Sequence, residues 1–267
     1  MKENLFEDKW ALVTGASSGI GKEIAFELAR KRANLVLVSR NESMLKILQN
    51  QLKEKYQVKV LFFSIDLSRS NVACEIEKYC EDHGICITIV VNNAGYALKT
   101  ANEIKKPEQV SGMLEVLVCN LTELSLRFLP GMMQKGEGYI LNVSSIVAYI
   151  PVASTLTYHA AKAYVLAFTK ALHWEYAKKG IHITCSLPGA TKTGFAKASD
   201  LYVPEQLWNT YGSAESVAKA SIKAMAKNQC IVIPGWNNRF LYWLSRILPH
   251  YWIYTCQKKY WSHYRPS

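Results

Sequence analysis

A tyrosine and a lysine four residues apart are the side chains in this sequence best suited to acid–base chemistry. Tyr158 and Lys162 would lie on one face of a helix, one turn apart. A free tyrosine has a pKa of about 10, which is too high for efficient proton transfer near neutral pH. A neighbouring ammonium favours the phenolate, so the spacing predicts that Lys162 lowers the pKa of Tyr158.

A serine hydroxyl is expected beside this pair. Residues 138–143 form an apolar run typical of a buried strand, and Ser144 and Ser145 follow its end. Because α/β sheets bind ligands at the carboxyl ends of their strands, a hydroxyl there can hold a carbonyl oxygen next to the phenol.

A glycine-rich loop joins the first predicted strand to the first predicted helix. Glycines permit a tight turn and a close approach of the backbone to a pyrophosphate, and the start of the helix attracts the anion. The spacing is G-x-x-x-G-x-G rather than the commoner G-x-G-x-x-G. The residues expected to hold a dinucleotide here are Thr14, Gly15, Ser17, Ser18, Gly19, Ile20 and Gly21.

The end of the second predicted strand bears on which dinucleotide would bind. An acidic residue at this point accepts the ribose 2′-hydroxyl of NAD, whereas an arginine accommodates the 2′-phosphate of NADP. The strand ends in Ser39, and Arg40 follows it. This favours NADP(H) over NAD(H), with an ordinary surface cation as the alternative interpretation of Arg40.

Over about residues 9–234 the chain resembles the short-chain dehydrogenase/reductase family. The segment 14–21 matches the family's TGxxxGxG loop, residues 92–95 read NNAG, and Tyr158 and Lys162 match its YxxxK motif. Ser145 lies thirteen residues before Tyr158, as the family pattern expects. Asn120 falls at the family's active-site asparagine.

This resemblance implies hydride transfer between a nicotinamide and a carbonyl or alcohol carbon. Tyr158 would donate the proton in reduction, Lys162 would lower its pKa and bind the nicotinamide ribose, Ser145 would orient the substrate oxygen, and Asn120 would support a water relay to Lys162. The other cofactor contacts that it implies are Asp66 and Leu67 on the adenine side, Asn93, Ala94, Gly95, Pro188, Gly189, Thr191 and Thr193. Many NADP-dependent members carry a basic residue where this chain has Ser18, so NAD remains an alternative.

The predicted substrate is apolar and lipid-like. Residues 10–40 are most similar to a narrower group, the long-chain 3-oxoacyl-CoA reductases and 17β-hydroxysteroid dehydrogenase-like proteins. Two segments that follow strand ends, 146–155 and 193–211, are rich in apolar side chains, as expected of a lipid pocket. The candidate lining residues are Val147, Ala148, Tyr149, Ile150, Pro151, Val152, Phe195, Leu201, Tyr202, Val203, Leu207 and Trp208.

Alternating strands and helices must position these groups. The strands are continuous apolar runs, which predicts a parallel sheet covered on both faces. We therefore expect an α/β fold, a single Rossmann-type doubly wound sheet of seven parallel strands, over residues 1–235. The predicted strands cover 9–14, 34–39, 58–63, 87–91, 138–143, 181–186 and 230–233. The predicted helices cover 20–32, 42–55, a segment from a cap at Ser68 to 82, 103–134 with a break near Ser111 and Gly112, 154–178 and 214–227.

Composition excludes several classes of protein. Of the 267 residues 49% are hydrophobic and 20% are charged, which is ordinary for a globular protein and unlike collagen or a disordered chain. Seven cysteines without a C-x-x-C pair or zinc spacing predict reduced thiols and no metal site. The start of the chain lacks the pattern of a signal peptide, and no run of about 18 apolar residues occurs. These features predict a cytoplasmic location.

The positive charge is concentrated near the C-terminus. The net charge is +11, and residues 216–267 contain eight basic and no acidic residues. No nucleic-acid motif accompanies this charge, so we expect no nucleic-acid partner. An anionic membrane surface or acyl carrier, or simply a solvated surface, would suit it.

Residues 236–267 form a basic aromatic tail with ten aromatic residues. Aromatic and basic residues together favour a membrane–water interface, so peripheral membrane contact is one hypothesis. The alternative is that the tail packs over the substrate mouth or a partner subunit.

The predicted helix at 154–178 is apolar nearly all round, which predicts a homodimer or homotetramer. Two other functions stay open: an NAD-dependent alcohol dehydrogenase of a small substrate, and a non-catalytic regulatory protein that binds the cofactor.

Overall fold

A parallel seven-stranded sheet forms the centre of the molecule in the computed structural model, which describes residues 5–150, 155–199, 205–249, 251–253 and 255. The strand order is β3-β2-β1-β4-β5-β6-β9, which confirms the predicted doubly wound sheet. The strands are β1 (Trp10–Thr14), β2 (Asn34–Ser39), β3 (Val60–Ser64), β4 (Ile87–Asn92), β5 (Gly138–Val143), β6 (Ile181–Ser186) and β9 (Ile231–Val232).

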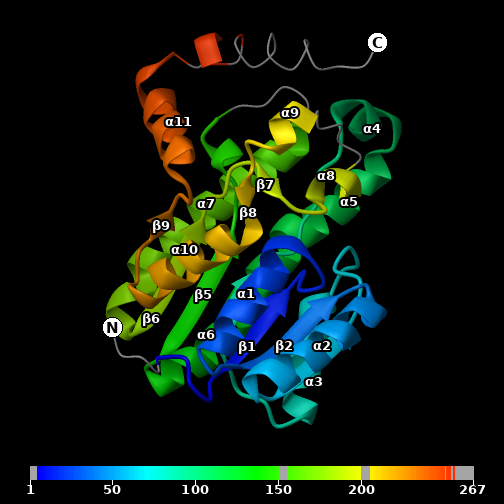
Figure 1. Cartoon of the computed structure of the whole chain (residues 1–267), viewed down its shortest axis with the longest axis vertical. Coiled ribbons are helices and arrows are strands. Elements are labelled where there is room, and N and C mark those ends of the chain that lie inside the picture. The colour runs from blue at the N-terminus through cyan, green and yellow to red at the C-terminus, as the bar shows by residue number, and fades with distance from the viewer. Residues whose placement is uncertain (1–4, 151–154, 200–204, 250, 254, 256–267) are drawn as a thin grey trace.

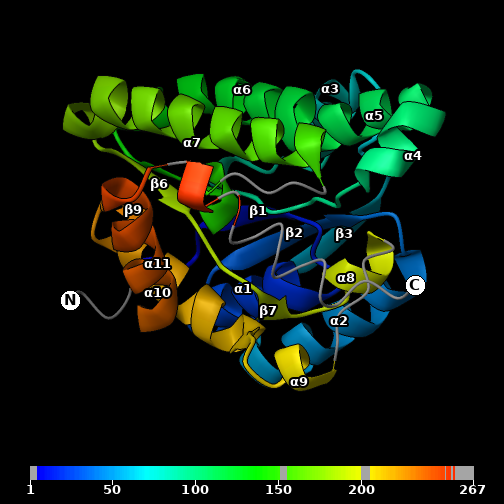
Figure 2. The same ribbon diagram turned by 90° about the horizontal axis from the view of Figure 1, so that it is seen from above.

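Helices cover both faces of this sheet, as the continuous apolar strands predicted (Figure 1). One layer consists of α1 (Gly19–Arg30), α2 (Glu42–Tyr56) and α10 (Ala214–Ala226). The other consists of α3 (Val72–Asp82), α6 (Asn120–Lys135) and α7 (Leu156–Tyr176). Figure 2 shows the two helical layers on opposite sides of the sheet.

Alternate side chains of each central strand enter opposite layers. Ala11 and Val13 of β1 pack into the cluster beneath α1 and α2, whereas Leu12 packs into the cluster beneath α3 and α6. Since both faces are buried, most positions of the central strands are apolar, and the period-two alternation of a half-exposed strand is absent. The two cores hold the carboxyl ends of β1, β4 and β5 at one edge of the sheet.

Two predicted helical boundaries are wrong. α3 begins at Val72 rather than after Ser68, because the Ser68 N–H donates to the Asp66 side chain in a turn and Asn71 takes a left-handed φ of 62°. The predicted break near Ser111 and Gly112 lies instead at Pro107, which lacks an N–H and restricts the residue before it.

The region predicted at 103–134 is therefore divided into shorter elements. They are α4 (Thr100–Lys105), α5 (Pro107–Leu114), a π-helical segment (Glu115–Cys119) and α6. Gly112 continues α5, where it packs beside Ser68. The π-helical segment was not predicted, and it directly precedes Asn120.

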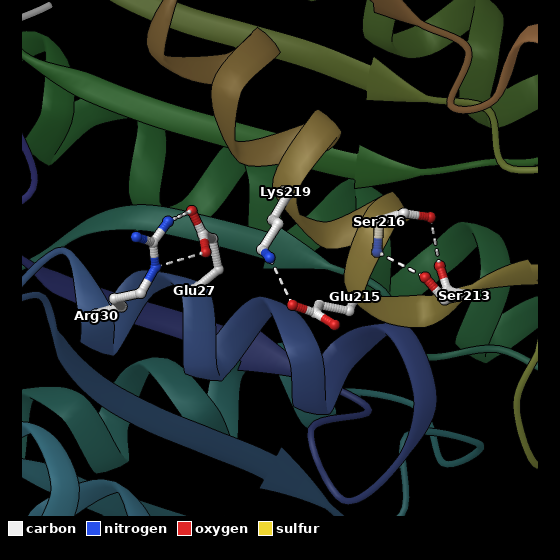
Figure 3. Close-up of polar contacts among 6 residues, drawn as sticks. All are labelled: Glu27, Arg30, Ser213, Glu215, Ser216 and Lys219. Atoms are coloured by element: carbon white, nitrogen blue, oxygen red, sulfur yellow. Dashed lines mark hydrogen bonds and ion pairs between the residues drawn. The ribbon is translucent and has the colours of Figure 1, made fainter.

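A second, two-stranded sheet of β7 (Thr191–Lys192) and β8 (Gly212–Ser213) was not predicted from the sequence. It fixes both ends of the segment that contains α8 (Phe195–Ala198) and α9 (Glu205–Trp208). Ser213 also begins α10, because its hydroxyl accepts a hydrogen bond from the Ser216 N–H at 3.1 Å (Figure 3). In the neighbouring α1 the buried Glu27 carboxylate accepts from Arg30 at 2.7 and 3.0 Å.

The C-terminal tail begins with α11 (Trp236–Ile247), a helix that follows β9. Of the rest of the predicted tail, residue 250, residue 254 and residues 256–267 lie outside the described residues. Among the described helices, none is long and apolar enough to cross a membrane.

The glycine turn after β1 should be sensitive to a single methyl group. A Cβ at Gly21 would lie 2.3 Å from the Gly15 carbonyl oxygen and 2.4 Å from Asn93 Nδ2, so Gly21→Ala should lower the free energy of unfolding by about 1–3 kcal/mol. Gly131→Ala in α6 is the matched control. No heavy atom lies within 4 Å of the Cβ it adds, so it should raise stability by about 0.5–1 kcal/mol. Urea unfolding of both variants measures the two signs, and equal effects would contradict this packing.

Candidate active site

The ends of β1 and β4 are locked together at the point where the strand order reverses. The Thr14 hydroxyl donates to the Val91 carbonyl at 3.3 Å and accepts from the N–H groups of Asn93 and Ala94 at 2.9 and 3.1 Å. Strands β2 and β3 lie on one side of β1 and the remaining strands on the other. Dinucleotides bind in the crevice at such a reversal.

The glycine turn fits a pyrophosphate. Gly15 and Gly19 have positive φ angles of 65° and 56°, and Asn93 Nδ2 donates to the Thr14 carbonyl at 3.0 Å. Within the described chain the Ser18 side chain at the start of α1 makes no capping hydrogen bond. The first N–H groups of α1 are therefore left to an anion. Thr193 lies against this turn, since a Cβ on Gly19 would meet its side chain at 3.0 Å.

A hollow of about 460 Å³ lies at the carboxyl ends of β2 and β3. Arg40 and Asp66, two of the residues predicted to contact the dinucleotide, line it, and Arg69 lines it while paired to Glu75 at 2.9 Å. Ser39 accepts from the Asn41 N–H at 3.1 Å, so this strand end carries a hydroxyl and not a carboxylate. The hollow thus presents the exposed guanidinium of Arg40.

Tyr96 is a neighbour of this hollow that the sequence did not single out. Burial raises the pKa of its phenol, the Arg40 charge lowers that pKa and the Asp66 charge raises it, which places Tyr96 within reach of both groups. Its position directly after the Asn-Asn-Ala-Gly segment is the only sequence signal that could have indicated it.

Tyr158, Lys162 and Ser145 converge at the end of β5. The Lys162 ammonium is buried, donates to the Val143 carbonyl at 2.8 Å and lies 5.6 Å from the centroid of the Tyr158 ring. The Ser145 hydroxyl is hydrogen-bonded to Tyr158. The neighbouring Ser144 donates to the Lys162 carbonyl at 2.7 Å instead, so Ser145 is the serine that reaches the phenol.

The pKa of Tyr158 is shifted in the opposite direction from the sequence prediction. Burial raises it above its ordinary value, and the hydrogen bond with Ser145 lowers it by less. Burial also lowers the pKa of Lys162 to about 8, because an ammonium without water around it is disfavoured. The ammonium is bonded to Val143, and in this arrangement it does not offset the burial of the phenol. Tyr158 is accordingly a protonated phenol at neutral pH.

Asn120, the first residue of α6, connects that helix to the loop after β3. Its Nδ2 donates to the carbonyls of Leu67 and Arg69 at 2.9 and 3.1 Å, and its Oδ1 accepts from the Ala73 N–H at 3.1 Å. These bonds occupy its side chain. Any contribution to a water relay would come from its main chain, whose N–H donates to the Glu115 carbonyl five residues back in the π-helical segment.

The remaining predicted site residues border the same edge. A Cβ on Gly95 would lie 3.8 Å from Lys162 Nζ, and the Pro188 carbonyl accepts from Ser145 at 3.4 Å. Thr191 donates to the Gly189 carbonyl at 2.8 Å. Gly189 packs against Asn238 of α11, a contact that the sequence gave no reason to expect.

The structure describes part of the predicted substrate lining. The ring of Phe195 lies 5.6 Å from that of Tyr158, and Tyr149 lies on the loop after Ser145. Of the other predicted lining positions, Pro151, Val152, Leu201, Tyr202 and Val203 are outside the described residues, as is the side chain of Leu207.

Comparison with known proteins decides the family. The model of the short chain dehydrogenase family matches residues 9–201. The chain belongs to the short-chain dehydrogenase family. It is therefore an oxidoreductase, of a family that binds NAD or NADP, and this confirms the resemblance seen in the motifs.

Individual relatives of this short-chain dehydrogenase are also named as reductases or dehydrogenases. It is 34% identical over 227 residues to a very-long-chain 3-oxoacyl-CoA reductase of Rattus norvegicus, a match covering 81% of this chain and 68% of the relative. It is 32% identical over 251 residues to a hydroxysteroid dehydrogenase-like protein 1 of Gallus gallus, covering 92% and 74%. A short-chain dehydrogenase of Sphingobium yanoikuyae, solved in complex with NADPH, superposes with a TM-score of 0.78 at 28% identity, covering 87% and 91%.

Burial of Lys162 predicts a distinctive pH dependence of stability. Between pH 8 and 10 the folded protein loses the Lys162 proton while the unfolded chain retains it, so the free energy of unfolding should rise with pH by about 2 kcal/mol from this group. Above pH 10 the raised pKa of Tyr158 lowers the free energy of unfolding as pH rises, because the folded protein retains the phenolic proton while the unfolded chain loses it.

The measurement is the difference in unfolding free energy between the protein and Lys162→Met, taken across pH 8–10. Lys170→Met, on the exposed side of the same helix, controls for loss of a lysine from α7. A pH-independent difference for Lys162→Met would show that this ammonium is solvated.

Proposed function

We propose that this short-chain dehydrogenase is an NADP(H)-dependent ketone reductase acting on an apolar, lipid-like substrate such as a 3-oxoacyl thioester or a steroid. The observation that carries the proposal is the protonated phenol of Tyr158 beside the buried Lys162 ammonium, at the sheet edge where the glycine turn lies. A proton donor is what reduction of a ketone requires, because the alcohol oxygen must gain a proton as its carbon gains hydride.

Each residue has a separate part in this reaction. A bound nicotinamide would supply the hydride to the carbonyl carbon. Tyr158 gives its phenolic proton to the carbonyl oxygen, and Ser145 holds that oxygen by a hydrogen bond. The Lys162 ammonium, 5.6 Å from the ring centroid, stabilises the phenolate that remains. Asn120 holds the start of α6 against the loop after β3, and thereby fixes the floor of the site.

The choice of NADP rests on the end of β2. Arg40 is exposed at the hollow and makes no ion pair among the described residues, whereas Arg69 is already paired with Glu75. A planar guanidinium suits a phosphate, and the strand ends in Ser39 rather than in the carboxylate that accepts a ribose 2′-hydroxyl. The alternative, an NAD-dependent alcohol dehydrogenase of a small substrate, would require the 2′-hydroxyl to be bound without that acceptor.

The apolar substrate is supported by the residues around Tyr158 and by the relatives. Phe195 lies against the phenol, Tyr149 flanks the loop after Ser145, and Ile146 of that loop is buried. A very-long-chain 3-oxoacyl-CoA reductase and a hydroxysteroid dehydrogenase-like protein are named among similar proteins, and both names denote lipid chemistry. A non-catalytic cofactor-binding protein is disfavoured because Asn120, Ser145, Tyr158 and Lys162 are all present.

Assembly into a homodimer or homotetramer stays a prediction. Its support is the apolar outer surface of α6 and α7, which remains exposed in the single chain. The exposed residues there are Leu126, Met133, Leu156, Tyr164 and Trp174.

Removing the phenolic hydroxyl tests the proposed proton donor. Tyr158→Phe should lower kcat for NADPH-dependent ketone reduction by about 10²–10⁴-fold, the usual contribution of a general acid, with NADPH affinity changed by less than about threefold. Tyr164→Phe makes the same change two turns further along α7, at a hydroxyl bonded to Thr122, and should leave kcat intact. Equal kcat in the protein and in Tyr158→Phe would refute the assignment.

Neutralising Arg40 tests the cofactor. Arg40→Leu removes a charged hydrogen bond of about 1.5–3 kcal/mol to a 2′-phosphate, so the ratio of kcat/KM with NADPH to that with NADH should fall by about 10–100-fold. Arg69→Leu, which removes a guanidinium already paired with Glu75, should change that ratio by less than about threefold. A preference for NADH in the unmodified protein would contradict the NADP proposal.

A further inference from the structure

Helix α11 exposes its apolar side and turns its polar side inward, which is the reverse of an ordinary surface helix. Its outward side is apolar: Trp236, Phe240, Trp243 and Ile247 are 75%, 59%, 64% and 78% exposed. Its inward side consists of Asn238, Tyr242 and Ser245. At about 100° per residue these two sets fall on opposite faces of the helix. A helix that only packs on its own protein would bury the first set and expose the second.

Contacts of the inward side hold α11 to the active-site edge. Asn238 donates to the Pro234 carbonyl at 2.7 Å and packs on Gly189, while the Tyr242 ring meets the Tyr149 ring edge-on at 4.8 Å. Figure 1 shows α11 at the same end of the molecule as β7, β8 and α9. The apolar side is thus not needed for the fold, and it faces outward beside the loop that follows Ser145.

The apolar surface continues past the helix and is bordered by positive charge. Leu248, Tyr251 and Trp252 are exposed after the end of α11. Arg239 and Arg246 are exposed along one border of the apolar stripe, and the sequence has no acidic residue from 216 to 267. An apolar stripe rich in tryptophan and bordered by arginine is the composition of helices that lie in a membrane interface.

We propose that α11 is an interfacial helix that docks this protein on an anionic phospholipid surface, with Trp236, Phe240, Trp243 and Ile247 inserted at the boundary of headgroups and acyl chains. A second copy of the chain is disfavoured as the occupant, since pairing two α11 helices would bring together two surfaces without a single acid. Docking rests on the geometry and charge of α11 and not on the proposed reaction. If the proposed reaction also holds, docking sets the reductase edge beside its lipid-like substrates.

The test is flotation of the full chain with two kinds of vesicle: phosphatidylcholine alone, and phosphatidylcholine with about 30% phosphatidylserine. The protein should float with the anionic vesicles and far less with the neutral ones. Trp243→Ser/Ile247→Ser should lower the vesicle binding constant by about tenfold or more, because two anchors are removed. Ile47→Ser/Ile104→Ser is the matched control, removing two exposed apolar side chains from α2 and α4, and should bind as the protein does.

A second pair of variants tests the charge. Arg246→Gln should weaken binding to anionic vesicles by about fivefold, the contribution of one cation near such a surface. Lys46→Gln, an exposed cation on α2, should not. All these side chains are exposed, so an unchanged melting temperature establishes folding, and reduction of a water-soluble ketone in the absence of lipid should be unaffected.

Three outcomes would overturn the proposal: no flotation with either vesicle, flotation that the α11 variants leave unchanged, or equal flotation with neutral and anionic lipid. If Trp243→Ser/Ile247→Ser instead converts a dimer to a monomer in sedimentation velocity while vesicles bind nothing, the face belongs to a second copy. Absence of ketone reduction in the unmodified protein as well as in every variant would count against the proposed reaction and not against docking.

Discussion

The buried ammonium of Lys162 is the constraint on which the catalytic edge depends. A charge removed from water is tolerated only with hydrogen-bond partners, and the carbonyl at the end of β5 supplies one. This contact requires α7 to keep a fixed position along β5 and β6. Two buried hydrogen bonds hold the helix there: Asn142 donates to Thr169 at 3.0 Å, and the His173 ring bonds the Ile183 carbonyl at 2.8 Å. The helix that carries Tyr158 is thereby positioned by polar contacts as much as by apolar packing.

Hydrogen bonds also constrain the ends of β1 and β4, beside the glycine turn. The Thr14 hydroxyl ties β1 to the segment after β4, and that segment in turn closes on the glycine turn through Asn93. A further connection is made by Asn120, whose side chain bonds the loop after β3 while its main chain follows the π-helical segment. Hydrogen bonds therefore connect the residues at the ends of β1, β3 and β4 with the start of α6, and connected polar groups of this kind are what electrostatic preorganisation needs.

Much of this arrangement could be predicted from the sequence, and the exceptions have physical causes. The strands were predicted almost residue for residue, because burial on both faces leaves uninterrupted apolar runs. The convergence of Ser145, Tyr158 and Lys162 followed from the spacing of motifs on adjacent elements. The direction of the Tyr158 pKa shift could not be predicted, since it depends on how deeply the phenol is buried and on which acceptor the ammonium chooses. The π-helical segment and the β7–β8 pairing depend on tertiary contacts, which leave no local signal.

The orientation of α11 is another feature that the sequence could not predict. The sequence predicted a basic aromatic tail at residues 236–267, yet only the structure shows that the polar face of its helix is turned inward, against Gly189 and Tyr149. The helix therefore adds a surface beside the catalytic edge without contributing to the core.

Transfer of deuterium is the most direct test of the central claim that this protein reduces a ketone with hydride from NADPH. NADPH that carries deuterium in place of both hydrogens at the nicotinamide C4 position is incubated with the protein and a long-chain 3-oxoacyl thioester, and the product is analysed by mass spectrometry. The predicted result is a 3-hydroxyacyl product with one deuterium on the carbon that bears the hydroxyl, formed in proportion to the NADPH consumed. Consumption of NADPH without labelled alcohol, or no consumption across ketones of every size, would contradict it.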